Sequence, residues 1–245
     1  MIPKIIHQTW KTSTLPEKFQ TWHQKVKELH PDWKIILWTD EDNLALVTKF
    51  FPDLLEIYNS LQYNIMRADV IRYMYMSVYG GYYLDLDYEL FEPFDDKLSN
   101  ASLLLPISGK HRKMAVIGNS IFGSEPGNIF WKDILDTFKE NPPSKKFYDK
   151  FEILKLTGPD FISEVYYRNP TKYNATLVEK YVFHPENSLA NHKNYKQLLF
   201  AKGTRGIHHC EGSWLKDNNS FIHYLSRGKA SIKRRFQDLF GAKFK

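Results

Sequence analysis

The sequence predicts an α/β fold with a mostly parallel central sheet flanked by helices. Strand-like and helix-like patterns alternate along its N-terminal part, which is typical of parallel strands joined by crossover helices. A helical pattern then ends at Gly80-Gly81, and the apolar run behind it is long enough for one buried strand. With 245 residues, 42% of them hydrophobic, the chain can bury a sizeable core. We expect one domain over residues 1–225 and a tail over 226–245.

The N-terminal elements are expected in a regular order. Apolar runs predict strands over residues 2–10, 33–38 and 82–86, and helical spacing of apolar residues predicts helices over 16–29, 50–61 and 66–79. Thr39 is expected to cap a further short helix. Gly80 suits the left-handed cap of a helix C-terminus, because glycine has no Cβ to clash there.

The later elements follow with weaker patterns. Strands are expected over residues 103–106, 116–123 and 181–185, and an amphipathic helix from 127 to about 141. The run Thr157-Gly158-Pro159 is expected to open another helix. The amide groups at that helix start form either a site for an anion or a hydroxyl, or simply part of a turn.

The positive charge is concentrated at the C-terminus. Residues 227–245 contain seven basic side chains and one acid, which accounts for the whole formal net charge of +6. A nucleic-acid-binding body is therefore not indicated. The apolar residues of this tail recur about every fourth position, which predicts a basic amphipathic helix at an anionic membrane surface. A frayed, solvated terminus is the alternative.

Composition also bears on the compartment. The single cysteine, Cys210, excludes an intramolecular disulfide and fits a reducing environment. No run approaches the ~18 apolar residues of a membrane span, and Met1 is followed by a strand pattern without a secretion leader. We therefore expect a cytoplasmic protein with peripheral contact at the inner face of a membrane. A chain trimmed of an anchor would look the same.

Two acids follow the double glycine, one residue apart. In a regular strand Asp85 and Asp87 would point to the same face, where two anions repel each other unless a cation lies close by. Mg²⁺ or Mn²⁺ with a nucleotide diphosphate meets that need, because both cations prefer hard oxygen ligands. A solvated pair of acids at a strand end is the alternative.

The residues around these acids resemble a known family. The run Arg67-x-Asp69-x-x-Arg72-Tyr73, the glycine pair and Tyr82-Tyr83-Leu84-Asp85-Leu86-Asp87 are similar to the core of sugar transferases with a DXD sugar-binding region. That family includes fungal initiating mannosyltransferases, bacterial capsule and lipopolysaccharide transferases and, more distantly, the glucosyltransferase domain of clostridial toxins. The resemblance implies a GT-A-type fold for nucleotide-diphosphate sugars over residues 1–225.

The resemblance also implies roles for the helix before the glycine pair. Asp85 and Asp87 would hold Mn²⁺ or Mg²⁺, and Arg72 would donate to the diphosphate. Asp69 would receive sugar hydroxyls, with help from Arg67. The alternative for Asp69 and Arg72, which are three residues apart, is a plain intrahelical ion pair.

Further donor-binding positions are implied along the chain. Trp10 would stack on the nucleotide base, unless it is a core residue. Tyr83 would touch the donor sugar or pack in the core. Asn119 would lie near the donor sugar or acceptor, or serve a turn. Ser213 and Trp214 would cover the diphosphate once their loop closes.

A late histidine cluster completes the implied site. The run His208-His209-Cys210-Glu211-Gly212-Ser213-Trp214 resembles the family's closing His-x-x-Gly-Ser-Trp element. That spacing favours His209 as the third metal ligand, with His208 and Glu211 as alternatives. A zinc site including Cys210 is disfavoured, because a four-ligand spacing is absent.

The implied function is a retaining, metal-dependent glycosyltransferase. It would move a hexose from GDP-mannose or a UDP-sugar to a glycan or lipid-linked glycan, as in the synthesis of capsule, lipopolysaccharide or another surface polysaccharide. We find no carboxylate suited to a covalent nucleophile, so a front-face attack is expected. The alternatives are a sugar-nucleotide hydrolase or phosphoesterase, a non-catalytic sugar-nucleotide or glycan-binding module, and a toxin-like enzyme with a protein acceptor.

Overall fold

The structure is a computed structural model that describes residues 1–94, 100–111, 114–144, 147–185, 199 and 203–211. Nine strands occur in this part of the chain: β1 (Ile5–Thr9), β2 (Lys34–Trp38), β3 (Gly81–Leu84), β4 (Tyr88–Leu90), β5 (Leu103–His111), β6 (Met114–Ile117), β7 (Ile121–Ser124), β8 (Thr176–Val178) and β9 (Gly206–His208). Its main helices are α1 (Glu17–Leu29), α2 (Asp40–Phe50), α3 (Leu55–Ser60), α4 (Asn64–Tyr79), α6 (Ile129–Glu140), α7 (Lys150–Leu156) and α8 (Pro159–Arg168). Two further helices of four residues each are α9 (Pro170–Tyr173) and α10 (Lys180–Phe183).

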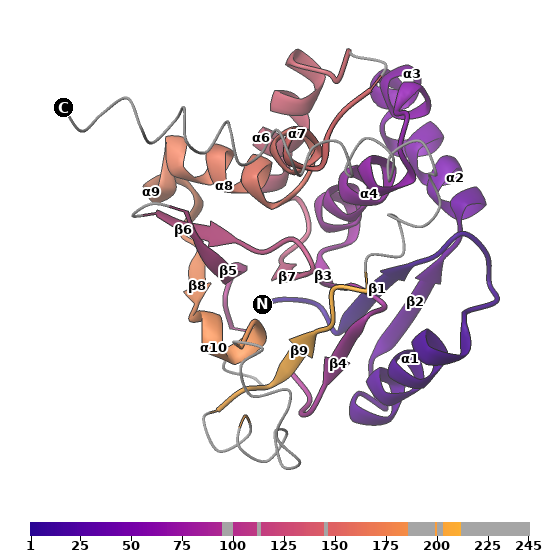
Figure 1. The fold of residues 1–245 in the computed structure, drawn as a ribbon, viewed down its shortest axis with the longest axis vertical. Coiled ribbons are helices and arrows are strands. Elements are labelled where there is room, and N and C mark those ends of the chain that lie inside the picture. The colour runs from indigo at the N-terminus through magenta and orange to yellow at the C-terminus, as the bar shows by residue number, and fades with distance from the viewer. Residues whose placement is uncertain (95–99, 112–113, 145–146, 186–198, 200–202, 212–245) are drawn as a thin grey trace, which may run out of the picture.

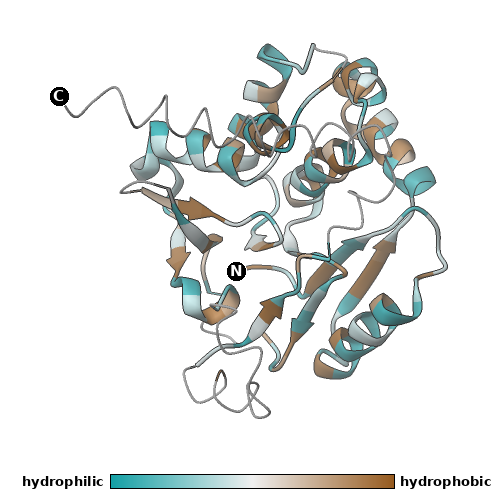
Figure 2. Cartoon of the chain, in the orientation of Figure 1, coloured by the Kyte–Doolittle hydropathy of each residue, from teal (hydrophilic) through white to brown (hydrophobic). Residues whose placement is uncertain are grey.

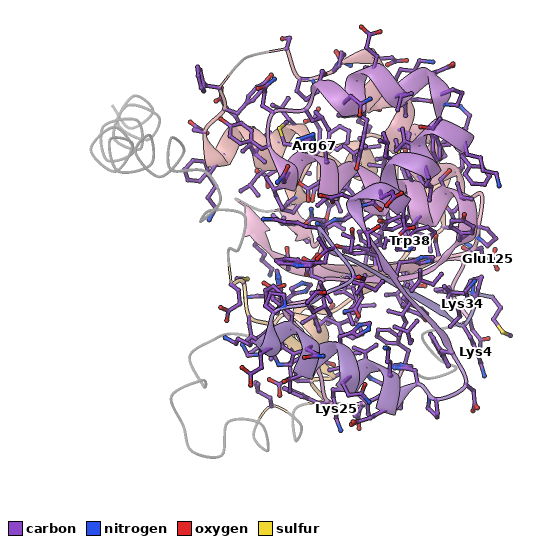
Figure 3. The ribbon with its side chains drawn as sticks, turned by 90° about the vertical axis from the view of Figure 1, so that its right-hand side faces the viewer. Lys4, Lys25, Lys34, Trp38, Arg67 and Glu125 are labelled. Atoms are coloured by element: carbon purple, nitrogen blue, oxygen red, sulfur yellow. The ribbon has the colours of Figure 1, made fainter. Side chains whose placement is uncertain are left out.

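The strands form one main sheet in the order β2-β1-β3-β7-β5-β6, with β8 beside β5, and a separate pair β4-β9. Strand β1 is parallel to both β2 and β3, and the Lys34 N–H donates to the Lys4 carbonyl where β1 and β2 begin side by side (Figure 3). Strand β8 is parallel to β5, whereas β7 runs antiparallel to β3 and β5, and β6 antiparallel to β5. The expected α/β fold with flanking helices is confirmed. The antiparallel pairings, which involve β7, β5 and β6, lie on one side of the parallel strands β2, β1 and β3.

The helices cover both faces of the sheet. Figure 1 shows α2, α3, α4, α6, α7 and α8 gathered on one side and α1 on the other. Alternate residues of β3 therefore enter different cores: Tyr83 packs with α4 and α6, whereas Tyr82 packs with Val26 of α1. Figure 2 shows β2 as mainly apolar and α1 as mixed, which fits a half-buried helix and a partly buried strand at the edge of the sheet.

The glycine pair connects α4 directly to β3. Gly80 has φ +61° and ψ −151°, and Gly81 has φ +86°. Gly80 thus takes the positive φ that was expected, but its ψ is extended rather than helical, because the chain enters β3 without an intervening loop. A Cβ on Gly81 would lie 2.6 Å from the Ile5 carbonyl oxygen, so the close approach of β1 also requires glycine.

Several element predictions need correction. The single helix expected over 50–61 is divided, because Pro52 starts a 3-10 turn over Pro52–Leu54 between α2 and α3. The strand expected over 181–185 is instead the helix α10, since a short apolar run fits either state and Phe183 packs in the core as part of a helical turn. The strand expected over 116–123 is interrupted by residues 118–120, which separate β6 from β7.

The tail and the domain limit at residue 225 lie outside the described residues. Among the helices that the structure describes, none is long and apolar enough to cross a bilayer.

Candidate active site

A cavity of about 980 Å³ lies at the carboxyl ends of the parallel strands β1 and β3. Thr9 and Trp10, at and just after the end of β1, line it together with Asp85 and Asp87, which follow β3. Ligands of open α/β sheets commonly bind outside these strand ends, where the backbone carries no further pairing and side chains from neighbouring strands meet. This cavity is therefore the candidate site.

The two acids lie in a tight turn rather than in a strand. Strand β3 ends at Leu84, and the Tyr88 N–H donates to the Asp85 carbonyl at 3.2 Å. The same turn starts β4, whose partner β9 brings His208 opposite Tyr88. His208 Nε2 lies 3.0 Å from Asp87 Oδ1 and 3.6 Å from Asp85 Oδ2. One ligand atom from each of the three side chains lies within 4.8 Å of the other two.

The geometry places His208, rather than the preferred His209, beside the two acids. Adjacent residues at a strand end point to opposite sides, so only one of the two histidines can face the acids. His209 instead stacks on Trp22 at 4.5 Å and lies 3.0 Å from Glu89 Oε2. Glu211 contacts the acids only through its backbone, whose N–H donates to Asp87 Oδ2 at 2.8 Å. The pairing of β4 with β9, which selects His208, leaves no signal in local sequence.

The pKa values of Asp85, Asp87 and His208 depend on burial and on the charges of their neighbours. Burial raises the pKa of the Asp85 carboxyl, against the opposing charge of Arg72. Burial alone would also raise the pKa of Asp87, but the hydrogen bond and charge of His208 hold it below its usual value. Burial alone would lower the pKa of His208, and its hydrogen bonds to Asp87 and Cys210 raise it to about 10 instead. A protonated imidazole therefore supplies the positive charge beside the two acids.

This donor set fits a divalent cation. Two carboxylates and one imidazole with converging ligand atoms suit Mn²⁺, and the carboxylates also suit Mg²⁺. A metal ion would displace the proton of His208, because a ligating imidazole must offer a lone pair. The residues present thus match the metal requirement that the DXD resemblance implies.

Arg72 places a second positive charge against the acids. Its Nη1 lies 3.1 Å from Asp85 Oδ1, and the side chain is 4% exposed. Nε and Nη1 donate to the carbonyls of Ala68 at 2.9 Å and Asn119 at 2.6 Å. The guanidinium also lies over the ring of Tyr83, whose hydroxyl donates to Asp85 Oδ1 at 2.6 Å. The arginine is therefore fixed before any substrate binds.

Asp69 lies behind Arg72 and completes a buried network. Its Oδ1 lies 3.3 Å from Arg72 Nη2 and accepts from Asn119 Nδ2 at 2.9 Å, and its Oδ2 accepts from Thr157 Oγ1 at 3.0 Å. Burial raises the pKa of Asp69 to about 7, and its charged partners only partly oppose that rise. Asp69 and Arg72 therefore form the intrahelical ion pair and also border the cavity, and their contacts with sugar hydroxyls and diphosphate stay predictions.

Four further residues that were expected to bind the sugar-nucleotide donor line the same cavity. Trp10, Arg67, Tyr83 and Asn119 all line it. Trp10 packs edge-on against Phe19 at 5.2 Å, and Arg67, labelled in Figure 3, donates to Asn64 Oδ1 at 3.2 Å. Ser213 and Trp214 lie outside the described residues, so their assignment stays a prediction.

The cavity also contains polar residues that sequence reasoning left unassigned. They come from elements far apart in the chain, and they include Asp40, Asn43, Tyr58, Ser120 and His184. The Thr157-Gly158-Pro159 run was recognised as a helix start, and it is one, with Gly158 preceding α8. The hydrogen bond from Thr157 to Asp69 depends on how α8 docks, which the run itself does not indicate.

The α/β sheet, the turn with Asp85 and Asp87, the three converging ligand side chains and the buried arginine match the arrangement that the DXD resemblance implies. Residues 16–104 of the chain match the family described as "Glycosyltransferase sugar-binding region containing DXD motif". The predicted resemblance is therefore confirmed.

Several curated relatives are named as fungal mannosyltransferases or mannosyl lipid synthases. The chain is 37% identical over 174 residues to mannosyl phosphorylinositol ceramide synthase SUR1 of Saccharomyces cerevisiae, covering 68% of this chain and 42% of the relative. It is 30% identical over 232 residues to inositol phosphoceramide mannosyltransferase 2 of Schizosaccharomyces pombe, covering 95% of this chain and 64% of the relative. The chain thus spans about half of the length of these curated relatives.

A solved structure supports the fold. PaToxG Glycosyltransferase superimposes with a TM-score of 0.53 over 68% of this chain and 69% of that chain, at 18% identity. At this identity the similarity shows a shared glycosyltransferase fold.

Proposed function

We propose that the protein is a metal-dependent glycosyltransferase that moves a hexose from a nucleotide-diphosphate sugar to a hydroxyl group. The observation that carries the proposal is the convergence of Asp85, Asp87 and His208 next to Arg72 in one cavity. Among the donors expected, GDP-mannose ranks ahead of the UDP-hexoses, because the relatives are named for mannosyl transfer.

Asp85, Asp87 and His208 would hold Mn²⁺ or Mg²⁺. The ion would act as a Lewis acid that stabilises negative charge on the departing diphosphate. Arg72 adds a fixed positive charge beside the same acids, and a charge that is already oriented costs no reorganisation during the reaction. Asp69 and Asn119 keep that arginine in place.

Other residues of the chain bind and orient the donor. Trp10, which lines the cavity, provides an aromatic face for the base, and Arg67 lines the same cavity from the first turn of α4. Tyr83 orients Asp85 through its hydroxyl. We propose that the sugar configuration is retained, as the family resemblance implies. A front-face attack would then account for retention without a covalent intermediate, because both oxygens of Asp69 are already engaged by protein groups and Asp85 belongs to the metal set.

The acceptor is proposed to be a glycan or glycolipid. The relatives are named for an inositol phosphoceramide acceptor, which is a lipid carrying a polyol, and a lipid-linked acceptor would suit a membrane contact through residues 227–245. A cytoplasmic location at the membrane and a role in surface polysaccharide synthesis belong to the same proposal.

The test is a donor screen with Mn²⁺, in which nucleotide release and glycosylated product are measured for GDP-mannose and a panel of UDP-sugars. Asp85→Asn and Asp87→Asn should each lower turnover at least ~100-fold. Asp53→Asn is the matched control, because Asp53 pairs with Lys139 on the surface and should leave turnover unchanged.

Three outcomes would contradict the proposal in different ways. Equal release of free sugar with and without acceptors would indicate a hydrolase. Nucleotide binding without turnover would indicate a binding module. Full turnover in both asparagine variants would remove the acid pair from the mechanism.

A further inference from the structure

A second polar pair lines the cavity beyond the acids. Ser120 directly precedes β7, and His184 directly follows α10. Ser120 Oγ lies 3.0 Å from His184 Nε2, and both residues border the cavity. Ser120 is only 3% exposed, so its hydroxyl faces a confined space rather than bulk solvent. Neither residue takes part in the metal set or in the network around Arg72.

The backbone fixes this pair relative to the acids. The Asp85 N–H donates to the Ser120 carbonyl at 2.8 Å, so the turn with the acids and the start of β7 are joined directly. On the other side, a Cβ on Gly118 would lie 2.8 Å from His184 Cε1. Glycine at position 118 therefore leaves the space that the imidazole ring fills. The rings of His184 and His208 are 6.4 Å apart at a right angle, which keeps the pair close to the metal ligands.

The pair offers an acceptor of hydrogen bonds. Burial and the nearby charge of His208 lower the pKa of His184 to about 3, so the ring is neutral at neutral pH. If Ser120 donates to Nε2, both lone pairs of its oxygen are left. If the imidazole donates instead, one lone pair and the hydroxyl proton are left. In either case Ser120 Oγ can accept a hydrogen bond from a hydroxyl group in the cavity.

The order of the strands places this pair on the side opposite the expected base. Along the edge of the sheet, Trp10 follows β1, Asp85 follows β3, and Ser120 precedes β7. The acids therefore lie between the aromatic face of Trp10 and the Ser120–His184 pair. The cavity volume of about 980 Å³ is at the upper end of the range of ~300–1,000 Å³ for ligand pockets, which leaves room for a second substrate.

We propose that Ser120, oriented by His184, binds the acceptor hydroxyl, and that this end of the cavity is a subsite for a polyol such as a sugar or a cyclitol. The inference rests on the proposed glycosyl transfer, for which it locates the acceptor. Ser120 touches the acceptor, and His184 and Gly118 are positioning residues.

The experiment measures polyol binding without catalysis. The full chain, labelled at its histidine rings, is loaded with Mg²⁺ and GDP and titrated with methyl α-D-mannopyranoside or with myo-inositol, and the His184 ring signal is followed by NMR. The signal is assigned by its loss in His184→Gln. At least one probe should shift it, and the probe that does so distinguishes a sugar from a cyclitol acceptor.

Two variants test the assigned residues. Ser120→Ala removes the hydroxyl and should weaken the responding polyol about tenfold, as expected for one lost hydrogen bond in a confined site. Gly118→Ala should weaken it similarly, because the added Cβ displaces the imidazole without removing a polar atom. Ser60→Ala is the matched control, because the Ser60 hydroxyl donates to the Ile57 carbonyl at 2.8 Å on the exposed surface and Ser60 does not line the cavity. Binding of GDP should be unchanged in all three.

The proposal is overturned if neither polyol shifts the His184 signal up to its solubility limit, or if Ser120→Ala binds the polyol as tightly as Ser60→Ala does. The donor screen is scored separately by nucleotide release. Polyol binding without nucleotide release would contradict the glycosyltransferase function and leave the subsite intact, and release without polyol binding would do the reverse.

Discussion

Arg72 Nη1 lies 3.1 Å from Asp85 Oδ1, and both side chains are largely excluded from solvent. The arginine is held there by the carbonyls of Ala68 and Asn119 and by Asp69 on its other side. A cation that is already desolvated and oriented stabilises negative charge more effectively than one that must be recruited from solvent. This contact joins the helix before the glycine pair to the acids after it.

Replacing Arg72 by lysine should distinguish the contribution of its positive charge from that of its hydrogen bonds. Lysine keeps the positive charge but cannot donate to both carbonyls and both acids, so buried acceptors are left without donors. We expect Arg72→Lys to lower the free energy of unfolding by about 2 kcal/mol and kcat/KM about 100-fold. Urea unfolding and nucleotide-release kinetics measure the two effects.

The matched control for this change is Arg168→Lys. Arg168 pairs with Glu164 on the surface, where both side chains are more than half exposed, so the loss should stay within about 0.5 kcal/mol. Equal stabilities of the two variants would show that the buried contacts of Arg72 contribute nothing.

The two neighbouring histidines should respond differently to alanine. His208→Ala removes the imidazole that faces Asp85 and Asp87. We expect the affinity for Mn²⁺ to fall by a factor of about 10 to 100. His209→Ala removes a ring that stacks on Trp22, so it should lower the free energy of unfolding by about 1 kcal/mol and leave Mn²⁺ affinity unchanged. Calorimetric titration with Mn²⁺ separates the two cases. A larger loss of affinity in His209→Ala would restore the ligand assignment made from spacing alone.

The part of the site that sequence predicts is the part encoded within one local stretch. Arg72, Asp85 and Asp87 belong to a single helix, turn and strand, where spacing determines which side chains meet. The strand-helix alternation likewise predicts β1, β2 and the helices between them, because each pattern depends only on its own residues.

The choice of His208 among the candidate ligands, and the unassigned pair Ser120 and His184, depend on long-range packing. His208 faces the acids only because β9 pairs with β4, and Ser120 meets His184 only because α10 docks near the start of β7. The run 181–185 shows the same limit, since its apolar pattern fits a strand, and the docking of Phe183 in the core favours a helix. Tertiary contacts override local preference in both cases.

Alanine substitutions at three glycines should distinguish the cost of a positive φ angle from the cost of a steric clash. Gly81 has φ +86° and a neighbouring carbonyl 2.6 Å from the position of a Cβ, whereas Gly127 has φ +67° with open space around it. We expect Gly81→Ala to cost more than about 3 kcal/mol of unfolding free energy and Gly127→Ala about 1 kcal/mol. Gly109→Ala, with no clash and no positive φ, is the control and should change stability by less than about 0.5 kcal/mol. Urea denaturation orders the three, and equal costs for Gly81 and Gly127 would exclude the contact with β1 as the cause.

The ring of His7 should make the fold sensitive to acid. Trp38 Nε1 can only donate, so His7 Nδ1 accepts that hydrogen bond at 3.0 Å, and the protonated Nε2 donates to the Gly80 carbonyl at 2.9 Å. The ring is thereby held neutral at the start of the glycine pair. Burial is the main reason that its pKa falls from 6.5 to about 4.

The sign of the pH effect follows from that lowered pKa. Between pH 6.5 and about 4 the unfolded chain binds the His7 proton and the folded protein does not, so stability is complete above pH 6.5 and is lost as the pH falls through this window. At a pH of about 4.5 the loss assigned to His7 should be about 2 kcal/mol. His7→Phe keeps an aromatic ring against Trp38 and Tyr75 but cannot titrate. The unfolding free energy of both proteins is measured in urea at several pH values. Between pH 6.5 and about 4.5 the variant should lose about 2 kcal/mol less than the unmodified protein does. Parallel pH profiles for the two proteins would exclude His7 as a source of acid sensitivity, because the other buried histidines are common to both.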